Sequence, residues 1–592
     1  MYQPEEVLVQ LLEPTIDSEI EDLDESDTEE YIDQSAIVPQ RIVDNDTPAN
    51  FEKDLEQDAE GSTADGNSDF SHHIFRWRSM ATPMVSTPGS PENDFSLPPS
   101  NVDEMTPLAY FQKFWKPELN EHIAHQTNLY GMQKECYSVG TSRDEIEQFI
   151  GMQMLMSVIK LPAYDMYWAT ETRYDQVANV MGKNRYKTIR RFLHVNDNSE
   201  LNDETIHNKL FKIQPVLYHV RENCKALEPE VQNSIDEQII PAKTVYSGIR
   251  QYNPKKPKKW GFKNFVRSGS SGMMYDFFLY QGATTSADGQ KCTGSYVVLK
   301  LSEGLPKHQQ FKIFFDNWFC SLQLCLQLKS MGYLVTATVR ADRVKKCPLP
   351  SEKELKKLGR GAHAYKTDAN SGLTITKWYD NKCVQMASTY CNPDASAPVK
   401  RWDRANKRYI EINCPTVVHE YNKNMGGVDL SDMLIALYRT QIKIKRWYLK
   451  VLFHCVDIAK VNAWLLYRRH CEQLGTPKRR QLSLLKFTIA IASALIHSRT
   501  LVSGVGRPLK RKSSGGYGSN SKKVPTAPSP IDDIRFDHVS HWPEYKPDKR
   551  KCKLCKIGQS RVYCIKCKVC LCLSNERNCF LKYHTNPSDT AL

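Results

Sequence analysis

Four aspartates stand in sequence contexts that suit metal chemistry. Asp236 and Asp316 each end a short apolar run, so we expect each to lie where a strand leaves a sheet. A carboxylate at such a point is held rigidly and stays open to a ligand. Asp429 and Asp432 are three residues apart and follow Gly426-Gly427, which predicts that they share one face at the start of a helix.

Converging carboxylates repel one another unless a cation lies between them. Mg²⁺ takes oxygen ligands, and two such ions can activate a water or a 3′-hydroxyl on one side of a phosphorus and stabilise the leaving oxygen on the other. The aspartates therefore predict a Mg²⁺ or Mn²⁺ site for phosphoryl transfer. Spacing alone is a weak signal, because 68 acidic residues supply many accidental triples.

A second group of candidate metal ligands, cysteines and histidines, lies between residues 541 and 584. Paired Cys-x2-Cys knuckles place two thiolates on one tetrahedral Zn²⁺, so we expect zinc rather than disulfides or free thiols. With one upstream histidine there are eight ligands, enough for two zinc ions, while Cys570 is spare and the sharing of ligands stays open. The eight are His541, Cys552, Cys555, Cys564, Cys567, Cys572, Cys579 and His584. Such a module could bind DNA, bind a protein or act as a ubiquitin-ligase RING, and the lysines around it favour DNA.

A lysine-rich segment with one tryptophan, residues 255–263, follows Asp236 in the sequence. Trp260 lies among five lysines, a combination that suits phosphate and base contacts. The lysines are Lys255, Lys256, Lys258, Lys259 and Lys263. The alternative is a solvated hairpin with Trp260 in the core.

The overall charge is divided along the chain. Residues 1–70 contain 22 acidic and only two basic residues, a net charge of −20, which leaves 78 basic and 46 acidic residues, or +32, in residues 71–592. An excess of this kind suits a protein that binds a polyphosphate, although basic side chains also simply solvate a surface. The start lacks the pattern of a signal peptide, no stretch reaches the roughly 18 apolar residues of a membrane span, and cysteine usage outside the tail is that of a reducing compartment. We therefore expect an intracellular protein without membrane contact.

The elements that must position these residues fall into several predicted units. Ser142 and Glu145 fit a capping box at the start of a helix. Short apolar runs after residue 231, including 296–299, predict strands. Further helices are predicted from about 428 to 469 and near 483–497. The predicted units are a disordered acidic leader (1–103), helices (104–230), an α/β core (231–345), an insertion (346–415), the helix of the third aspartate (416–440), helices (441–502), a basic Gly/Ser/Pro linker (503–535) and the cysteine-rich tail (536–592).

The surroundings of the aspartates resemble one family. Ser-Ile-Asp-Glu at 234–237, Lys-Pro-Lys-Lys-Trp-Gly-Phe-Lys at 256–263, Asp-Asn-Trp-Phe-Cys-Ser at 316–321 and Tyr-Asn-Lys-Asn-Met-Gly-Gly-Val-Asp at 421–429 together resemble the piggyBac transposases over roughly residues 105–475 and the cysteine tail. Cys320 stands where threonine is frequent in the family, and the acidic leader is not part of the shared core.

The resemblance implies a fold and a function. It implies an RNase H-like catalytic core with an insertion domain, flanked by a helical dimerisation and DNA-binding domain and followed by a small crossed-brace zinc domain. It assigns Asp236, Asp316 and Asp429 to the catalytic triad and Asp432 to a neighbouring acid. It also implies a homodimer that nicks the ends of a DNA element, excises the element and inserts it at TTAA. We therefore expect a nuclear, metal-dependent DNA transposase, or alternatively a domesticated DNA-binding or chromatin protein that performs no cleavage.

Overall fold

The computed structural model describes most of the chain after the acidic leader. The described residues are 73–80, 95–96, 98, 106–202, 208–243, 248–254, 258–282, 292–344, 346–403, 406–497, 535, 541–555 and 557–585. Residues 1–72 and 503–534 of the basic linker lie outside them, so the expectations about those segments remain expectations.

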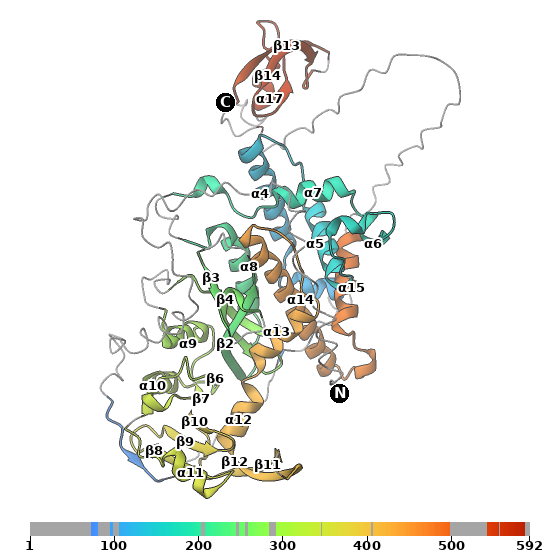
Figure 1. Ribbon diagram of the computed structural model, residues 1–592. Coiled ribbons are helices and arrows are strands. Elements are labelled where there is room, and N and C mark those ends of the chain that lie inside the picture. The colour runs from blue at the N-terminus through green and yellow to red at the C-terminus, as the bar shows by residue number, and fades with distance from the viewer. Residues whose placement is uncertain are drawn as a thin grey trace.

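A ten-stranded mixed sheet forms the centre of the molecule (Figure 1). Its first part is antiparallel, because β4 (Trp260–Gly269) pairs with β2 (Gln232–Pro241), β3 (Arg250–Tyr252) and β5 (Met274–Leu279). Next to β2 the pairing becomes parallel, through β6 (Lys312–Phe315) and β7 (Leu334–Thr338). The sheet then continues antiparallel through β10 (Cys383–Ser388), β9 (Thr374–Tyr379), β8 (His363–Asp368) and β1 (Trp77–Arg78).

Helices cover both faces of this sheet and bury two apolar cores. One core joins the sheet to α8 (Gln214–Lys225), α13 (Gly427–Leu437) and the long α14 (Trp447–Gln473). The other lies under α9 (Gly294–Ser302) and α10 (Leu322–Ser330).

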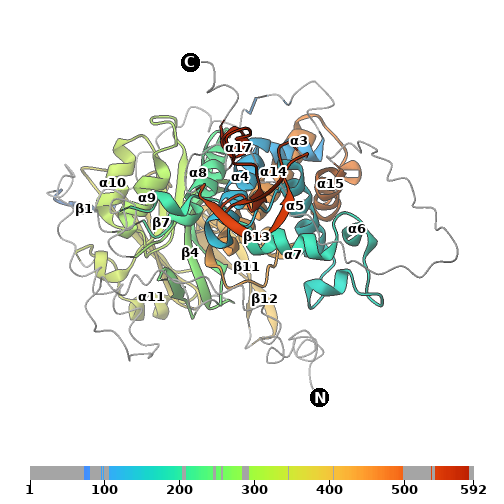
Figure 2. The same cartoon turned by 90° about the horizontal axis from the view of Figure 1, so that it is seen from above.

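The helices that precede and follow the sheet in sequence pack into one unit. Within it α5 (Arg143–Val158) packs against α15 (Leu484–His497), and α14 packs against α3 (Pro107–Gln112). Figure 2 shows α4 (Pro117–Glu135), α5, α7 (Lys183–Phe192) and α15 together on one side of the sheet. Ser142 caps α5 as expected, but the Glu145 carboxylate pairs with Arg185, 2.5 Å away.

Two predictions about secondary structure are wrong. Residues 296–299 lie in helix α9, not in a strand, because an apolar run of four fits either period and the Thr293 side chain caps the helix. The helix expected from about 428 to 469 is interrupted between α13 and α14. Buried Asp457 accepts hydrogen bonds from the Thr440 backbone (2.9 Å) and from Lys460 (2.8 Å), and so holds the interrupting segment in place.

The segment expected as an insertion is partly continuous with the central sheet. Strands β8, β9 and β10 extend the sheet beyond β7, while only the hairpin of β11 (Ser396–Asp403) and β12 (Arg408–Pro415) forms a sheet of its own. The expected unit boundaries remain predictions.

The acidic leader is not wholly without structure. Residues 73–80 include β1, which pairs with β8, so the expectation of disorder up to residue 103 is wrong for this segment. None of the helices among the described residues is long and apolar enough to cross a membrane.

Candidate functional site

Asp236 and Asp316 lie side by side on parallel strands. The parallel register ends with Ile235 opposite Phe315, so each aspartate directly follows the last residue that is paired between β2 and β6. Asp316 follows the end of β6, as expected, but β2 continues antiparallel to β4 as far as Pro241, so Asp236 does not end its strand. Both aspartates are half-buried at the point where β2 and β6 separate.

Helix α13 brings the other two aspartates to the same strand. It packs on β2 and β4 with Asp429 in its first turn, and the Asp432 carboxylate accepts a hydrogen bond from Gln238 of β2 (3.3 Å). Gln238 is two residues from Asp236, so the two side chains project from the same face of the strand. The sheet and α13 therefore bring all four aspartates to the region of β2.

Two further residues orient Asp432. Arg439 donates to its carboxylate at 2.9 Å. On β2, Gln238 is itself fixed by the Nε2 atom of His454, 2.9 Å from its Oε1 atom. His454 is buried in α14, and burial lowers its pKa to about 3. The neutral imidazole therefore donates to Gln238, whose amide donates to Asp432.

The Asp316 carboxylate is held by a backbone hydrogen bond and has a raised pKa. Its carboxylate accepts the backbone N–H of Trp318 at 2.9 Å. Burial and the neighbouring Glu237 raise its pKa, and the N–H groups of Trp318 and Phe319 offset part of that rise. Negative charge is thus concentrated here without full compensation, which is the condition that a bound cation relieves.

Tyr421 on α12 (Thr416–Asn424) lies within electrostatic range of Asp316 and Asp236. Burial raises the pKa of its hydroxyl, and the charges of Asp316 and Asp236 raise it further. The phenol is therefore neutral and lies within electrostatic reach of both carboxylates.

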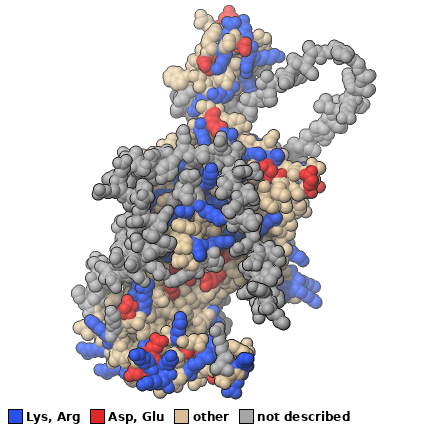
Figure 3. All heavy atoms as spheres, in the orientation of Figure 1, with Lys and Arg blue, Asp and Glu red and all other residues tan. Residues whose placement is uncertain are grey.

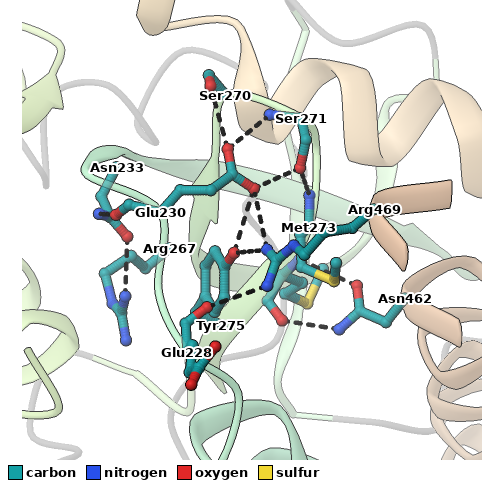
Figure 4. Close-up of polar contacts among 11 residues, drawn as sticks. Glu228, Glu230, Asn233, Arg267, Ser270, Ser271, Met273, Tyr275, Asn462 and Arg469 are labelled. Carbon is teal, nitrogen blue, oxygen red and sulfur yellow. Dashed lines mark hydrogen bonds and ion pairs between the residues drawn. The ribbon is translucent and has the colours of Figure 1, made fainter. Parts of the chain in front are cut away.

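A polar network fixes the turn that supports α13 (Figure 4). Glu230 accepts hydrogen bonds from Ser270 Oγ (3.1 Å), Ser271 N (3.1 Å) and the Tyr275 hydroxyl (3.1 Å), and lies 3.5 Å from Arg469. The next residues of this turn contact α13, because Leu430 is the nearest side chain to Gly272. Glu230, two residues before β2, thus connects the β4–β5 turn, Tyr275 of β5 and Arg469 of α14.

The carboxylates do not form a closed metal cluster. Among the described residues, two groups of potential ligands have all donor atoms within 4.8 Å of one another, and both lie in the cysteine tail. The four aspartates are brought to one region, but no three of them have carboxylate oxygens that all lie within 4.8 Å of one another.

The lysines expected to contact DNA differ in their exposure. Lys255 and Lys256 lie outside the described residues, while Lys258 and Lys259 are exposed. Lys263 is buried, 3.9 Å from Glu237, with its Nζ atom 4.7 Å from the centroid of the Trp318 ring, and so belongs to the carboxylate site.

Trp260 is 43% exposed, and the Arg250 guanidinium lies 4.0 Å from the centroid of its ring, so the alternative of a core tryptophan is wrong. Lys and Arg also gather over the tail and over the end of the molecule with α11 (Glu352–Leu358) and β12, where Asp and Glu are interspersed (Figure 3).

The eight expected zinc ligands form two groups of four in the tail. This tail consists of β13 (Pro543–Lys551), β14 (Gln559–Cys564), β15 (Val569–Cys570) and α17 (Cys579–His584). One group is Cys552, Cys555, Cys572 and Cys579, and the other is His541, Cys564, Cys567 and His584. The Cys564 and Cys567 pair lies in sequence between the two cysteine pairs of the first group, so the groups interleave. Cys570 belongs to neither.

Local chemistry in the tail fits a metal. His584 Nδ1 lies 2.8 Å from the Phe580 carbonyl, and its buried Nε2 atom has no hydrogen-bond partner among the described residues. A hydrogen bond from the Cys567 side chain and contacts with the two histidines lower the pKa of Cys564 to about 3. At Gly558 a Cβ atom would lie 2.7 Å from the Cys572 sulfur, so a side chain there would enter the first group.

Sequence reasoning missed the residues that support the aspartates. Gln238 carried a usable signal, since it follows Asp236 at the two-residue period of a strand. His454, Arg439 and Glu230 reach the site from distant segments, and nothing in their local sequence distinguishes them.

Comparisons with known proteins agree on one family. A family model described as Transposase IS4 matches residues 106–464, more than half of the chain. The chain is 28% identical to PiggyBac transposable element-derived protein 3 of Homo sapiens, covering 85% of this chain and 79% of the relative. It is also 28% identical to the human PiggyBac transposable element-derived protein 2, over 76% of this chain and 72% of the relative.

A solved structure shares the fold. The cryo-EM structure of a piggyBac transposase synaptic complex with hairpin DNA aligns with a TM-score of 0.57 and 22% sequence identity, covering 79% of this chain and 97% of that chain.

Proposed function

Because the chain belongs to the piggyBac-type transposase family, we propose that it binds DNA and that Asp236, Asp316 and Asp429 hold the divalent metals of a strand-cleavage and strand-transfer reaction. Asp432 is the neighbouring fourth acid. One observation carries the proposal: the parallel register of β2 and β6 ends immediately before Asp236 and Asp316, and α13 brings the other two aspartates to β2.

An RNase H-like core is part of this proposal. The strand order β5-β4-β2-β6-β7, with three antiparallel strands followed by two parallel ones, supports it. The helical segments before and after the sheet then form the proposed dimerisation and DNA-binding domain.

The donor atoms at the carboxylate site fit Mg²⁺ or Mn²⁺. All four side chains offer hard oxygen ligands. Burial and, after it, the charge of Glu237 raise the pKa of Asp316, and a bound cation would favour its ionised form. Bound divalent metals would activate a water or 3′-hydroxyl and stabilise the leaving oxygen. The protein's own contribution is positional: Gln238 and Arg439 orient Asp432, and the Trp318 N–H orients Asp316.

The DNA partner and the location of the protein follow by likeness to the family. We propose terminal-repeat-like DNA ends, TTAA targets, a homodimer and a nuclear location. The +32 charge of residues 71–592 supports a polyanionic partner. Two zinc ions in the tail would order a module that binds the DNA ends.

A domesticated DNA-binding protein without cleavage activity is the second candidate. The absence of a closed carboxylate cluster among the described residues favours it, as does the pairing of Asp432 with Arg439. In this case the aspartates would be an inherited feature, and DNA occupancy would not depend on them.

The discriminating experiment is a nicking assay on duplexes that carry candidate terminal repeats, with Mg²⁺ or Mn²⁺. We expect Asp316→Asn to abolish nicking and Asp175→Asn, an exposed acid on α6 (Asp175–Ala178), to leave it unchanged. Equal cleavage by Asp316→Asn would refute the catalytic assignment. A protein that binds these duplexes but cleaves none of them, with wild-type binding by the aspartate variants, would establish the second candidate.

The same duplexes test the lysines. Replacing exposed Lys258 and Lys259 with alanine should reduce the salt dependence of binding by about one unit of slope for each phosphate that a lysine no longer neutralises. Lys263→Met should leave that slope unchanged and affect nicking instead, because Lys263 is buried beside Glu237.

A further inference from the structure

A short strand from the acidic leader closes one edge of the central sheet. In β1, Trp77 pairs with Asp368 and Arg78 pairs with Thr367, both on β8 (Figure 1). The Arg76 carbonyl also accepts the N–H of Ala369 at 2.9 Å. Without β1, strand β8 would be the last strand of the sheet and would present unpaired backbone groups.

The docked segment has the alternation of a strand with one buried face. His73, Phe75 and Trp77 are partly buried, whereas the residues between them are exposed, with Ile74 at 74%. Phe75 and Trp77 stack on each other, with ring centroids 5.3 Å apart, and pack against the apolar core under α9 and α10. The leader therefore contributes apolar surface to the core as well as backbone hydrogen bonds.

Asp368 is the polar centre of this contact. The side chain is fully buried, and its carboxylate accepts the Arg76 N–H at 2.6 Å and lies 2.8 Å from His73 Nε2. Its remaining contacts are the N–H (3.0 Å) and hydroxyl (2.5 Å) of Ser371, in the turn after β8. Departure of the leader would remove two partners from a buried carboxylate, which is costly.

Two side chains of the core, Asn370 and Lys366, also donate hydrogen bonds to the docked segment. Asn370 donates to the Ile74 carbonyl at 3.2 Å, and Lys366 donates to Ser79 Oγ at 2.6 Å. Side chains of the core thus contact the segment from 73 to 79.

We propose that the edge of β8 is a binding site for an extended peptide, and that residues 73–79 of the same chain occupy it as a reversible clasp. The recognition chemistry is a β-strand with aromatic side chains at alternate positions and a histidine and a backbone N–H aimed at Asp368. The clasp fixes the point at which residues 1–70, with their net charge of −20, join the folded core. That point lies at His73 and Ile74, which contact Asp368 and Asn370, whereas Lys366 contacts Ser79 at the other end of the clasp.

The test separates the covalent connection from the docking contact. A specific protease site replaces residues 84–90 of the full chain, between the clasp and Phe95. After cleavage, the leader fragment is followed by size-exclusion chromatography in 1 M NaCl, where the Debye length of about 3 Å suppresses simple attraction between acidic and basic segments. We expect the fragment to elute with the core, and an excess of a synthetic peptide of residues 71–80 to displace it.

Variants within the leader keep the test independent of core stability. Phe75→Ala combined with Trp77→Ala should weaken retention by about tenfold or more, while Ile74→Ala, on the exposed face, should leave it unchanged. Release of the wild-type fragment on cleavage, or an equal effect of Ile74→Ala and the double variant, would overturn the proposal. Neither result bears on DNA cleavage.

Discussion

The backbone of Gly427 lies directly against the carbonyl group of Gly269. A Cβ atom at 427 would approach the Gly269 oxygen to 2.3 Å and Ser234 Oγ to 2.7 Å, so only glycine allows α13 to come this close to β2 and β4. Asp429 follows two residues later. The close contact at Gly427 therefore helps to position Asp429.

Gly427→Ala should displace α13 from the sheet. We expect a loss of about 1–3 kcal/mol in the free energy of unfolding, as for overpacked sites, together with a smaller rise in melting temperature on adding Mg²⁺. The matched control is Gly426→Ser, because a Cβ at 426 meets no atom within 4 Å and serine is a good N-cap residue. An equal loss in both variants would contradict the close-contact explanation.

Asp316 should destabilise the metal-free protein at neutral pH. Its pKa is raised in the folded state, so between the unfolded and folded pKa values the folded chain binds more protons and stability falls as pH rises. Asp316→Asn is therefore expected to raise the melting temperature without metal at pH 7, with the gain disappearing in acid. Added Mg²⁺ should stabilise the wild type and not the variant, and a variant less stable than the wild type at pH 7 would contradict this account.

The sequence predicts the position of Asp316 in the fold better than it predicts the residues that hold the aspartates in place. Asp316 is correctly expected at a strand end because Ile313-Phe314-Phe315 is a short, wholly buried run. Residues 296–299 are misread because a four-residue apolar run has no decisive period. The docked leader segment is missed because residues 1–103 as a whole are acidic, rich in Ser and Pro and without a sustained apolar period. The short alternation of His73, Phe75 and Trp77 has a clear meaning only when β8 lies opposite it. Gln238, His454 and Glu230 act through partners far away in sequence, which local patterns do not encode.

Glu230 should affect the carboxylate site without contacting it. Glu230→Gln removes the charge that holds Ser271, Tyr275 and Arg469 together, and we expect a loss of about 2 kcal/mol in the free energy of unfolding. The Mg²⁺-dependent rise in melting temperature should also shrink, because the turn that supports α13 is loosened. Glu228→Gln is the control, since the Glu228 carboxylate contacts the exposed Ser96, while only its backbone carbonyl accepts a hydrogen bond from Arg469. Unchanged metal stabilisation in Glu230→Gln would show that the network serves the fold alone.

The cysteine tail should hold two zinc ions per chain. Elemental analysis of the purified protein is expected to give two equivalents, and Cys564→Ser should lose at least the ion of the His541 group. Cys570→Ser is the matched control, because Cys570 is also buried but lies in neither ligand group. A zinc chelator should unfold the tail and leave the melting temperature of the core unchanged, since the small apolar cluster of the tail consists largely of the ligands themselves. Zinc loss in Cys570→Ser equal to that in Cys564→Ser would refute the ligand assignment.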